Sequence, residues 1–263
     1  MIHEISPHRF NNQYPTNPII SENDYVLYYH ENSLLLRSRD DQFEIPRKRD
    51  FPEITAETTY TFLFSLDEVP CFLIWDDLNV KSPDFQYKEI NFFRTAVQRE
   101  IAWIIIAGNQ LRTWYRQNSY CGNCGAKTEQ KTDERAIICP DCGTTVYPKI
   151  SPAIIVAIIC NNKILLASNA NFPGNWYSLI AGYADVGESL EETVIREVKE
   201  EVGIEVHNIR YYKSQPWPLS GSMMIGFIAE ADEDQPIIID DKEITEAPGS
   251  VGEICPTILQ RSV

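Results

Sequence analysis

The residues GYADVGESLEETVIREVKEEVGI, from Gly182 to Ile204, carry the most informative pattern in the second half of this chain. Within it, Glu192 follows Ser189 by three residues, which is the spacing of a capping box, and Gly203 supplies a C-terminal stop. Apolar residues recur at helical spacing along one face: Leu190, Val194, Val198 and Val202. The pattern predicts an amphipathic helix from Ser189 to Val202, about four turns long.

Three carboxylates gather on one side of this helix. Glu197, Glu200 and Glu201 stand at positions i, i+3 and i+4, which places them together. Unpaired, such a cluster repels itself, whereas hard divalent cations such as Mg²⁺ bind through oxygen and keep places for water and substrate phosphates. The alternative is a solvated acidic helix face, and a glutamate-rich helix alone would favour that alternative.

The complete spacing favours the metal site. The stretch resembles the Nudix box, G-x5-E-x7-R-E-U-x-E-E-x-G-U with U aliphatic, at every fixed position: Gly182, Glu188, Arg196, Glu197, Val198, Glu200, Glu201, Gly203 and Ile204. Proteins with this box hydrolyse nucleoside diphosphates linked to another moiety, and they fold as an α/β/α sandwich. The resemblance therefore implies an α/β Nudix sandwich in which the box forms a loop, a helix and a loop.

The resemblance also implies a set of metal ligands. Glu197 and Glu201 match the main ligands of a catalytic Mg²⁺ or Mn²⁺, and Glu200 matches a position that binds metal or positions water. These three glutamates are the expected catalytic residues. Ala181 matches a position whose backbone carbonyl binds metal, and Glu243 matches a downstream metal-binding glutamate.

Four further positions of the box have structural roles by the same resemblance. Glu188 and Arg196 are expected to orient the loop through an ion pair, and Gly182 and Gly203 are expected to be structural positions of the box.

Four cysteines predict a second, structural metal. Cys121, Cys124, Cys139 and Cys142 form two C-x2-C pairs, and a glycine follows the second cysteine of each pair. Each pair is a tight turn that points two thiolates at one tetrahedral centre, and Zn²⁺ bound by four sulfurs leaves no open position for catalysis. Four unrelated buried thiols are the alternative. Cys71, Cys160 and Cys255 are single and are expected to be packing residues.

The segment SQPWPLSGS, Ser214 to Ser222, narrows the family further. It resembles the S-Q-P-W-P-F-P-x-S signature of the NADH pyrophosphatase subfamily, with Leu219 and Ser220 in place of Phe and Pro. Two prolines fix an extended segment that can hold an aromatic face against a planar base. The resemblance implies substrate contacts from Gln215, Pro216, Trp217, Pro218, Leu219, Ser220, Gly221 and Ser222, and from Arg94, Glu134 and Tyr147. A rigid turn around a buried Trp is the alternative.

Three parts follow one another along the chain, in the order found in that subfamily. Residues 1–118 form a mostly β domain that ends in a long helix expected from Phe92 to Gln117, residues 119–148 form the zinc ribbon, and residues 149–263 form the Nudix domain. Short apolar stretches between polar turns predict the strands of the first part. No internal repeat is evident. The other tyrosines and Trp103, Trp114 and Trp176 are expected in cores.

Composition limits the partners. The net charge of −15 argues against a broad basic surface for nucleic acid or anionic membrane, although it leaves room for a local basic strip. The longest apolar runs, Ile101–Ala107 and Ala153–Cys160, are far shorter than the roughly 20 residues that span a bilayer. The first residues are polar, without the apolar core of a secretory signal. We expect a cytoplasmic protein without membrane contact, and the subfamily implies a homodimer.

The implied function is metal-dependent hydrolysis of the pyrophosphate of NADH or NAD⁺ to nicotinamide mononucleotide and AMP, with removal of the NAD cap from RNA 5′ ends as a related reaction. Two alternatives stay open. One is hydrolysis of ADP-ribose or other sugar nucleotides, favoured by Leu219 and Ser220. The other is a non-catalytic sensor of NAD or ADP-ribose, favoured by the residues after Ala247, which read Pro-Gly-Ser-Val-Gly where the subfamily has Arg-Trp-Phe and a final helix.

Overall fold

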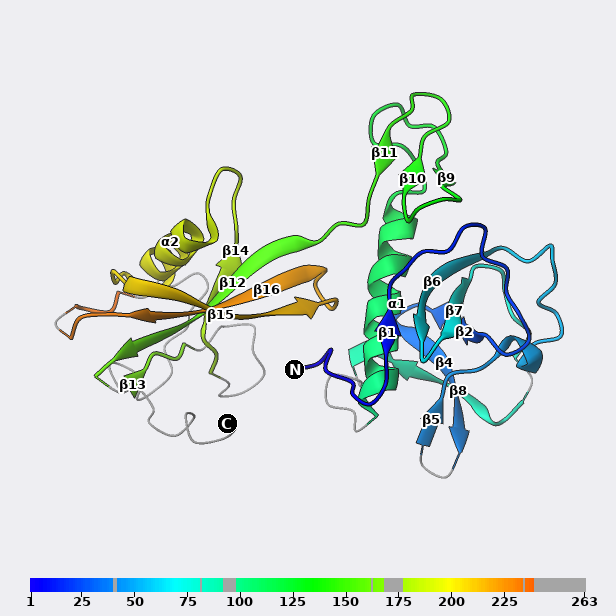
Figure 1. Ribbon diagram of the computed structural model, residues 1–263, viewed down its shortest axis with the longest axis horizontal. Helices are drawn as coiled ribbons and strands as arrows, with labels where there is room; N and C mark the ends of the chain where they lie inside the picture. Colours follow the sequence, from blue (N-terminus) through cyan, green and yellow to red (C-terminus); the bar gives the residue numbers. More distant parts are fainter. Residues whose placement is uncertain are drawn as a thin grey trace. The chain divides into compact units, whose positions relative to one another are not determined.

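The chain divides into two compact units. The computed structural model describes residues 1–39, 42–80, 82–91, 98–161, 163–167, 177–233 and 235–238. The first unit comprises Met1–Lys149 with Pro218–Ser220, and the second comprises Ile150–Trp217 and the residues from Gly221 onward. Both are drawn in Figure 1. No helix in the described ranges is long and apolar enough to cross a membrane.

Two small sheets form the N-terminal part of the first unit. One has the order β1-β6-β7-β2, in which β2 runs parallel to β7 and the other neighbours are antiparallel. In the other, β4 pairs with β3, β5 and β8. The elements are β1 (Phe10–Asn11), β2 (Tyr25–Leu27), β3 (Tyr29–His30), β4 (Ser33–Arg39), β5 (Gln42–Glu44), the 3₁₀ turn η1 (Lys48–Asp50), β6 (Tyr60–Leu66), β7 (Val69–Ile74) and β8 (Phe85–Glu89). The mostly β character expected from the sequence is confirmed.

The hairpin of β6 and β7 is apolar on both faces because each face covers a different core. Phe62 and Phe72 belong to one buried cluster, whereas Leu63 and Leu73 belong to the other. Its two turn residues, Asp67 and Glu68, have φ values of 49° and 67°, the left-handed conformation that a two-residue hairpin turn needs.

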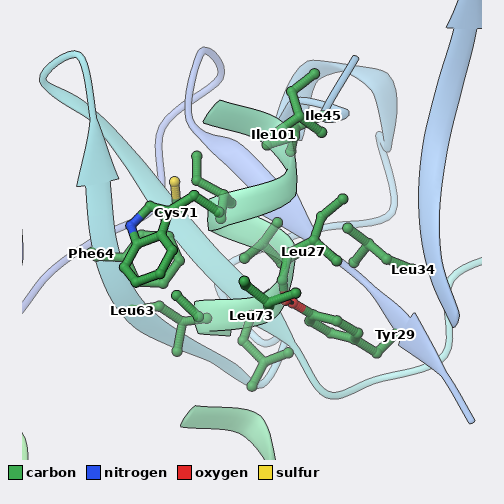
Figure 2. Packing of buried hydrophobic residues seen from close by; sticks show 14 of the residues in the cluster. Leu27, Tyr29, Leu34, Ile45, Leu63, Phe64, Cys71, Leu73 and Ile101 are labelled. Carbon is green, nitrogen blue, oxygen red and sulfur yellow. Dashed lines mark hydrogen bonds between the residues drawn. The ribbon is translucent and has the colours of Figure 1, made fainter. Parts of the chain in front are cut away.

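Helix α1 (Arg99–Gln117) fills the larger core of the first unit. Ile101 to Gly108 are buried without interruption, so this part of the helix is enclosed all round, as its continuous apolar run requires. The Tyr29 hydroxyl donates to the Ile105 carbonyl at 2.8 Å, and Leu27, Leu63 and Leu73 pack in the same cluster (Figure 2). Trp103 and Trp114 are buried here, which confirms their assignment to a core.

The helix begins later than the sequence suggested. At Gln98 the backbone is not helical, with φ −80° and ψ 83°, so the prediction of a helix continuous from Phe92 is wrong at this residue. The Gln98 side chain accepts a hydrogen bond from the Phe43 N–H and donates one to the Phe43 carbonyl, both at 2.9 Å. These two hydrogen bonds resemble those between paired strands, and they attach Gln98 to β5. Residues 92–97, including Arg94, lie outside the described ranges.

A three-stranded ribbon completes the first unit. Its order is β11-β10-β9, all antiparallel, with β9 (Glu129–Gln130), β10 (Ile137–Ile138) and β11 (Thr145–Val146). Gln130 donates to the Thr61 hydroxyl at 2.8 Å, and Arg135 donates to the Leu63 carbonyl, so the ribbon is bonded directly to β6.

The second unit is a mixed sheet covered by one described helix. The strand order is β13-β12-β16-β15, with β14 also paired to β12. Strand β16 runs parallel to β12 and antiparallel to β15. The bounds are β12 (Ser151–Cys160), β13 (Lys163–Ile164), β14 (Ile180–Tyr183), α2 (Leu190–Val202), β15 (His207–Trp217) and β16 (Ser222–Glu230). Val194, Val198 and Val202 of α2 pack on alternate residues of the sheet, including Ile154, Val156, Ile225 and Phe227. The predicted helix and its two ends are confirmed.

Several sequence expectations concern residues that the structure does not describe. Glu243, Trp176, Cys255 and the stretch after Ala247 all lie outside the described ranges. Cys71 is fully buried, as expected of a packing residue, and Cys160 is partly buried.

The enclosed segment of α1 predicts a sharp contrast between two isoleucines. Ile105 is 0% exposed and Ile19 is 77% exposed. Ile105→Ala should lower the free energy of unfolding by about 2–5 kcal/mol, because it leaves a cavity in a packed core. Ile19→Ala should change it by less than about 0.5 kcal/mol. Chemical unfolding followed by tryptophan fluorescence checks both, and equal effects would contradict the assigned burial.

Candidate active site and zinc ribbon

The Nudix-type stretch is held together by one arginine. Arg196, on α2, donates from Nε to Glu188 Oε1 at 2.5 Å and from Nη2 to Glu188 Oε2 at 2.9 Å. The same Nη2 donates to the Tyr183 carbonyl at 2.9 Å. The ion pair expected between Glu188 and Arg196 is therefore present, and it ties the end of β14 and the following loop to the middle of α2.

The loop has further supports on either side of Glu188. Glu188 Oε2 accepts from the Asp185 N–H and from the Thr193 hydroxyl, both at 3.1 Å. The capping box is complete: the Glu192 N–H donates to Ser189 Oγ at 3.2 Å, and the Ser189 N–H donates to Glu192 Oε2 at 2.7 Å. Gly203 ends the helix in the left-handed conformation, with φ 74°. These contacts fix the direction in which α2 leaves the loop.

Arg196 also draws two of the three predicted catalytic carboxylates toward itself. Its Nη1 donates to Glu197 Oε1 at 2.8 Å and to Glu200 Oε2 at 3.0 Å. The sequence predicted repulsion among these carboxylates and missed that the arginine beside them relieves it. Glu197 is only 13% exposed and Glu200 is 58% exposed, while Glu201 is half-buried one turn beyond Glu197.

Gly182 is required by the position of Glu197. A Cβ built on Gly182 would overlap the Glu197 carboxylate, so the carboxylate lies directly against the backbone of β14. Ala181 precedes this point and pairs with Ile155 of β12. Carboxylate and carbonyl oxygens are the donors that Mg²⁺ and Mn²⁺ prefer, so the donor chemistry fits a hard divalent cation. Among the described residues, however, the oxygens of these carboxylates do not lie close enough together to surround one metal ion. The sulfur atoms of the four ribbon cysteines do so.

The substrate-type segment lies on the hairpin of β15 and β16. Gln215, Pro216 and Trp217 pair with Met224, Met223 and Ser222. Pro216 stands on the last strand of the described sheet order, and proline within sheets is largely confined to such edge strands. Pro218 to Gly221 form the turn, with Gly221 at φ 68°, and the buried Ser222 hydroxyl lies 3.1 Å from the Tyr183 hydroxyl. The expected extended segment is confirmed through Trp217; Leu219 and Ser220 belong to the turn.

Two other expected substrate contacts meet within the ribbon. The exposed Tyr147 donates from its hydroxyl to Glu134 Oε1 at 3.3 Å, and Lys131 forms an ion pair with the same carboxylate. Glu134 and Tyr147 therefore form one polar cluster.

The four ribbon cysteines form a closed metal site. Their Sγ atoms all lie within 4.8 Å of one another, with Cys121–Cys142 at 3.6 Å and Cys124–Cys139 at 3.5 Å. Four thiolates around Zn²⁺ at about 2.3 Å would have sulfurs about 3.8 Å apart, so the spacing fits. Both knuckles have the same backbone pattern. Gly125 donates to the Cys121 carbonyl and Gly143 to the Cys139 carbonyl, each at 2.9 Å with φ of 78° and 74°.

Three family models match successive ranges of the chain. The NADH pyrophosphatase-like rudimentary NUDIX domain matches residues 23–114, the NADH pyrophosphatase zinc ribbon domain matches residues 116–147, and the NUDIX domain matches residues 149–254. A NAD-capped RNA hydrolase NudC of Pseudomonas fluorescens strain Pf-5 is 39% identical over 199 residues, which cover 75% of this chain and 72% of that protein. The chain belongs to the NADH pyrophosphatase family of Nudix hydrolases.

Other relatives match over shorter ranges. The NAD-capped RNA hydrolase NudC of Stutzerimonas stutzeri strain A1501 is 38% identical over 164 residues. These residues cover 62% of this chain and 59% of the length of that relative. A crystal structure of a NUDIX hydrolase from Nitrosomonas europaea has a TM-score of 0.41 and 27% identity, over 48% of this chain and 75% of that one.

The match to residues 23–114 assigns a likeness to the N-terminal domain that the sequence did not predict. The N-terminal β domain is similar to a rudimentary Nudix domain over these residues, although no internal repeat was evident in the sequence. Only three residues of the sequence point to this likeness. Arg99-Glu100-Ile101 repeats the Arg-Glu-aliphatic step of the box, but the buried Trp103 and Ile104 stand where the box has two glutamates.

The Glu188–Arg196 ion pair gives a prediction that depends on pH. Hydrogen bonding from Arg196 lowers the pKa of Glu188 from its ordinary 4.5 to about 2. Because the folded pKa lies below the unfolded one, this stabilisation is present above about pH 4.5 and is lost as the pH falls toward 2. Glu188→Gln should therefore lower the melting temperature near neutral pH, and its difference from the parent should shrink as the pH is lowered.

Thermal melts between about pH 7 and pH 3 measure this difference. Glu191→Gln is the matched control, because Glu191 is an exposed glutamate at the start of the same helix. A difference for Glu188→Gln that stays constant over the whole range would rule out the assigned ion pair as its cause.

The ribbon predicts about one zinc per chain by elemental analysis. Cys139→Ser should lose this zinc and unfold at a markedly lower temperature, because a four-thiolate site is part of the fold. Cys160→Ser, outside the ribbon, should keep the metal. A soluble, zinc-free Cys139→Ser variant with the parent's melting temperature would contradict a structural role.

Proposed function

We propose that this chain hydrolyses the pyrophosphate of NADH and NAD⁺ to nicotinamide mononucleotide and AMP, and that the same site removes the NAD cap from RNA 5′ ends. The observation that carries this proposal is the Arg196 cluster, which assembles the loop and helix of the Nudix box around Glu197 and Glu200. The names of the curated relatives, NAD-capped RNA hydrolase NudC, support the choice of substrate.

We assign the metal ligands to the carboxylates of α2 and their neighbours. Glu197 and Glu201 would be the main ligands of Mg²⁺ or Mn²⁺, with Glu200, the Ala181 carbonyl and Glu243 completing the set. When bound, such cations neutralise the diphosphate and supply a water of lowered pKa for in-line attack.

The chain's own residues supply the rigidity that this chemistry needs. Arg196 holds the loop through both oxygens of Glu188, so the loop cannot swing away from α2. Gly182 lets the Glu197 carboxylate rest on β14, which restricts its rotation. The fully buried Val194 and Val198 fix the opposite side of the helix in the core. A metal site needs this support, because small displacements of ligands weaken catalysis.

We assign substrate recognition to two groups of residues, one in each unit. In the second unit they are Gln215, Pro216, Trp217, Gly221 and Ser222; in the first they are Glu134, Tyr147, Pro218, Leu219 and Ser220, together with Arg94. Gln215 and Trp217 are half-buried on an extended strand, an arrangement suited to holding a planar base. We further propose a cytoplasmic homodimer; light scattering of the purified protein tests the dimer.

Hydrolysis of ADP-ribose or related sugar nucleotides is a second candidate. Leu219 and Ser220 stand where the subfamily signature has Phe and Pro, and both lie in the turn after Trp217. Release of AMP from NADH, NAD⁺ and ADP-ribose, compared as kcat/KM, separates the two candidates. A preference for ADP-ribose would replace the first proposal.

Glu201→Gln should lower the turnover of NADH by orders of magnitude while leaving the fold intact. The substitution removes a charged ligand but preserves side-chain size and helix propensity. Glu205→Gln is the matched control, because Glu205 is 82% exposed and follows the helix by three residues. Steady-state hydrolysis with Mg²⁺ and a melting curve check both variants, and near-parental turnover of Glu201→Gln would disprove the assigned metal site.

A further inference from the structure

Strand β15 carries a row of basic and aromatic side chains at spacings that do not suit an ordinary strand. His207, Arg210 and Lys213 are three residues apart, and Tyr211 and Tyr212 lie between the last two. Side chains of a regular strand alternate between faces, so residues three apart would point to opposite sides. The prediction that these tyrosines lie in a core is wrong, because Tyr211 is 61% exposed and Tyr212 is 69% exposed.

Two β-bulges bring the basic residues to one face. Between His207 and Arg210 the strand has an extra residue relative to β16, and between Tyr211 and Lys213 it has another. Each extra residue reverses the alternation that follows it. Asn208, at the first bulge, has φ 50°, and its side chain donates to Glu230 Oε2 at 2.8 Å.

The register identifies that face. Residues directly opposite each other in an antiparallel ladder point to the same side of the sheet. His207, Arg210 and Lys213 lie opposite Glu230, Ile228 and Gly226, which alternate with the buried residues that pack on α2. The three basic residues therefore lie on the face away from α2.

Tyr212 belongs to the same face, and Tyr211 does not. A Cβ built on Gly226 would contact Tyr212 Cδ1 at 3.8 Å, so the Tyr212 ring lies beside Gly226 on the basic face. Tyr211 lies opposite Phe227, which packs on α2, and their rings meet at 6.3 Å edge to face. The two neighbouring tyrosines thus lie on opposite sides of the sheet.

The basic face leads to the substrate-type segment. Gln215 and Trp217 lie opposite Met224 and Ser222, on the same side of the sheet as Tyr212. At about 3.3 Å per residue, Tyr212 is about 10–17 Å from them along the strand. A stacked single strand rises about 3.4 Å per nucleotide, so this distance corresponds to about three to five nucleotides.

We propose that the face of β15 formed by His207, Arg210, Tyr212 and Lys213 binds the single-stranded RNA that follows the NAD cap. An exposed aromatic ring flanked by cations is the arrangement by which proteins hold single strands without reading sequence, through base stacking and phosphate contacts. This inference rests on the proposed function, since it places the capped end of the RNA at Gln215–Trp217.

The electrostatics make stacking the larger contribution. Arg210 already faces Glu230, with its Nη2 4.0 Å from Oε1, and His207 Nε2 lies 3.9 Å from the same carboxylate. The face is therefore only weakly positive on a chain whose net charge is −15. We expect about two cations of this face to contact RNA phosphates. A plot of the logarithm of the RNA association constant against the logarithm of salt concentration should then have a slope of only about −1.4.

The test compares Tyr212→Ala with Tyr211→Ala in the full-length protein. Substrates are NADH and a NAD-capped single-stranded RNA of about twelve nucleotides; binding of the same RNA with a 5′-monophosphate is measured by fluorescence anisotropy without added divalent metal. Tyr212→Ala should lower both kcat/KM for capped RNA and RNA affinity by about 5- to 150-fold, the effect of losing one stacked base. NADH hydrolysis should be unchanged. Tyr211→Ala should leave both RNA readouts unchanged, and Tyr212→Trp should restore them.

Three outcomes would contradict the proposed RNA-binding face. Equal effects of the two alanine variants, no loss in Tyr212→Ala, or an equal loss of NADH hydrolysis in Tyr212→Ala would overturn the inference. If the parent cleaves neither substrate, the proposed function fails, and the anisotropy measurement still decides whether this face binds RNA.

Discussion

The candidate active site depends on the Arg196 guanidinium. Through it, one cation joins the end of β14, the loop that contains Glu188, and the carboxylates of Glu197 and Glu200. Like charges gathered on one helix would otherwise repel each other and weaken the helix. Because a carboxylate has two oxygens and about four lone-pair sites, bonds to Arg196 hold these groups in place while leaving acceptor capacity for a metal. The capping box at Ser189 complements the arginine, since it sets the direction of α2 while Arg196 sets the position of the loop.

The features that the sequence predicted well are those set by neighbours along the chain. The ends of α2 follow from Ser189, Glu192 and Gly203, all within or next to the helix, and the structure agrees. The cysteine knuckles are equally local, because each needs only a tight turn. The start of α1 is different. Gln98 leaves the helix because its amide bonds to the backbone of Phe43, a partner 55 residues earlier that no periodicity reveals.

Strand β15 shows the same limit. Its sequence, HNIRYYKSQPW, has no clear alternation, because the positions of the bulges depend on pairing with β16 rather than on the strand itself. The pairing of Tyr211 with Phe227 and the approach of the Tyr212 ring to Gly226 show that the two tyrosines lie on opposite faces. The shared role of Arg196 was missed for a related reason: the sequence predicted its bond to Glu188, whereas its bonds to Glu197 and Glu200 depend on how the guanidinium is turned.

The two Nudix-type units of this chain show how one helical pattern can supply either a core or a site. In α2, Arg196-Glu197-Val198 is followed by Glu200 and Glu201, and its polar side remains accessible. In α1, Arg99-Glu100-Ile101 is followed by Trp103 and Ile104, and the helix is enclosed from Ile101 to Gly108. Enclosure excludes carboxylates, because an unpaired buried charge is strongly destabilising. The enclosed segment of α1 is therefore unsuited to holding metal-binding carboxylates. The first unit instead carries the zinc ribbon, through contacts such as the Gln130–Thr61 hydrogen bond.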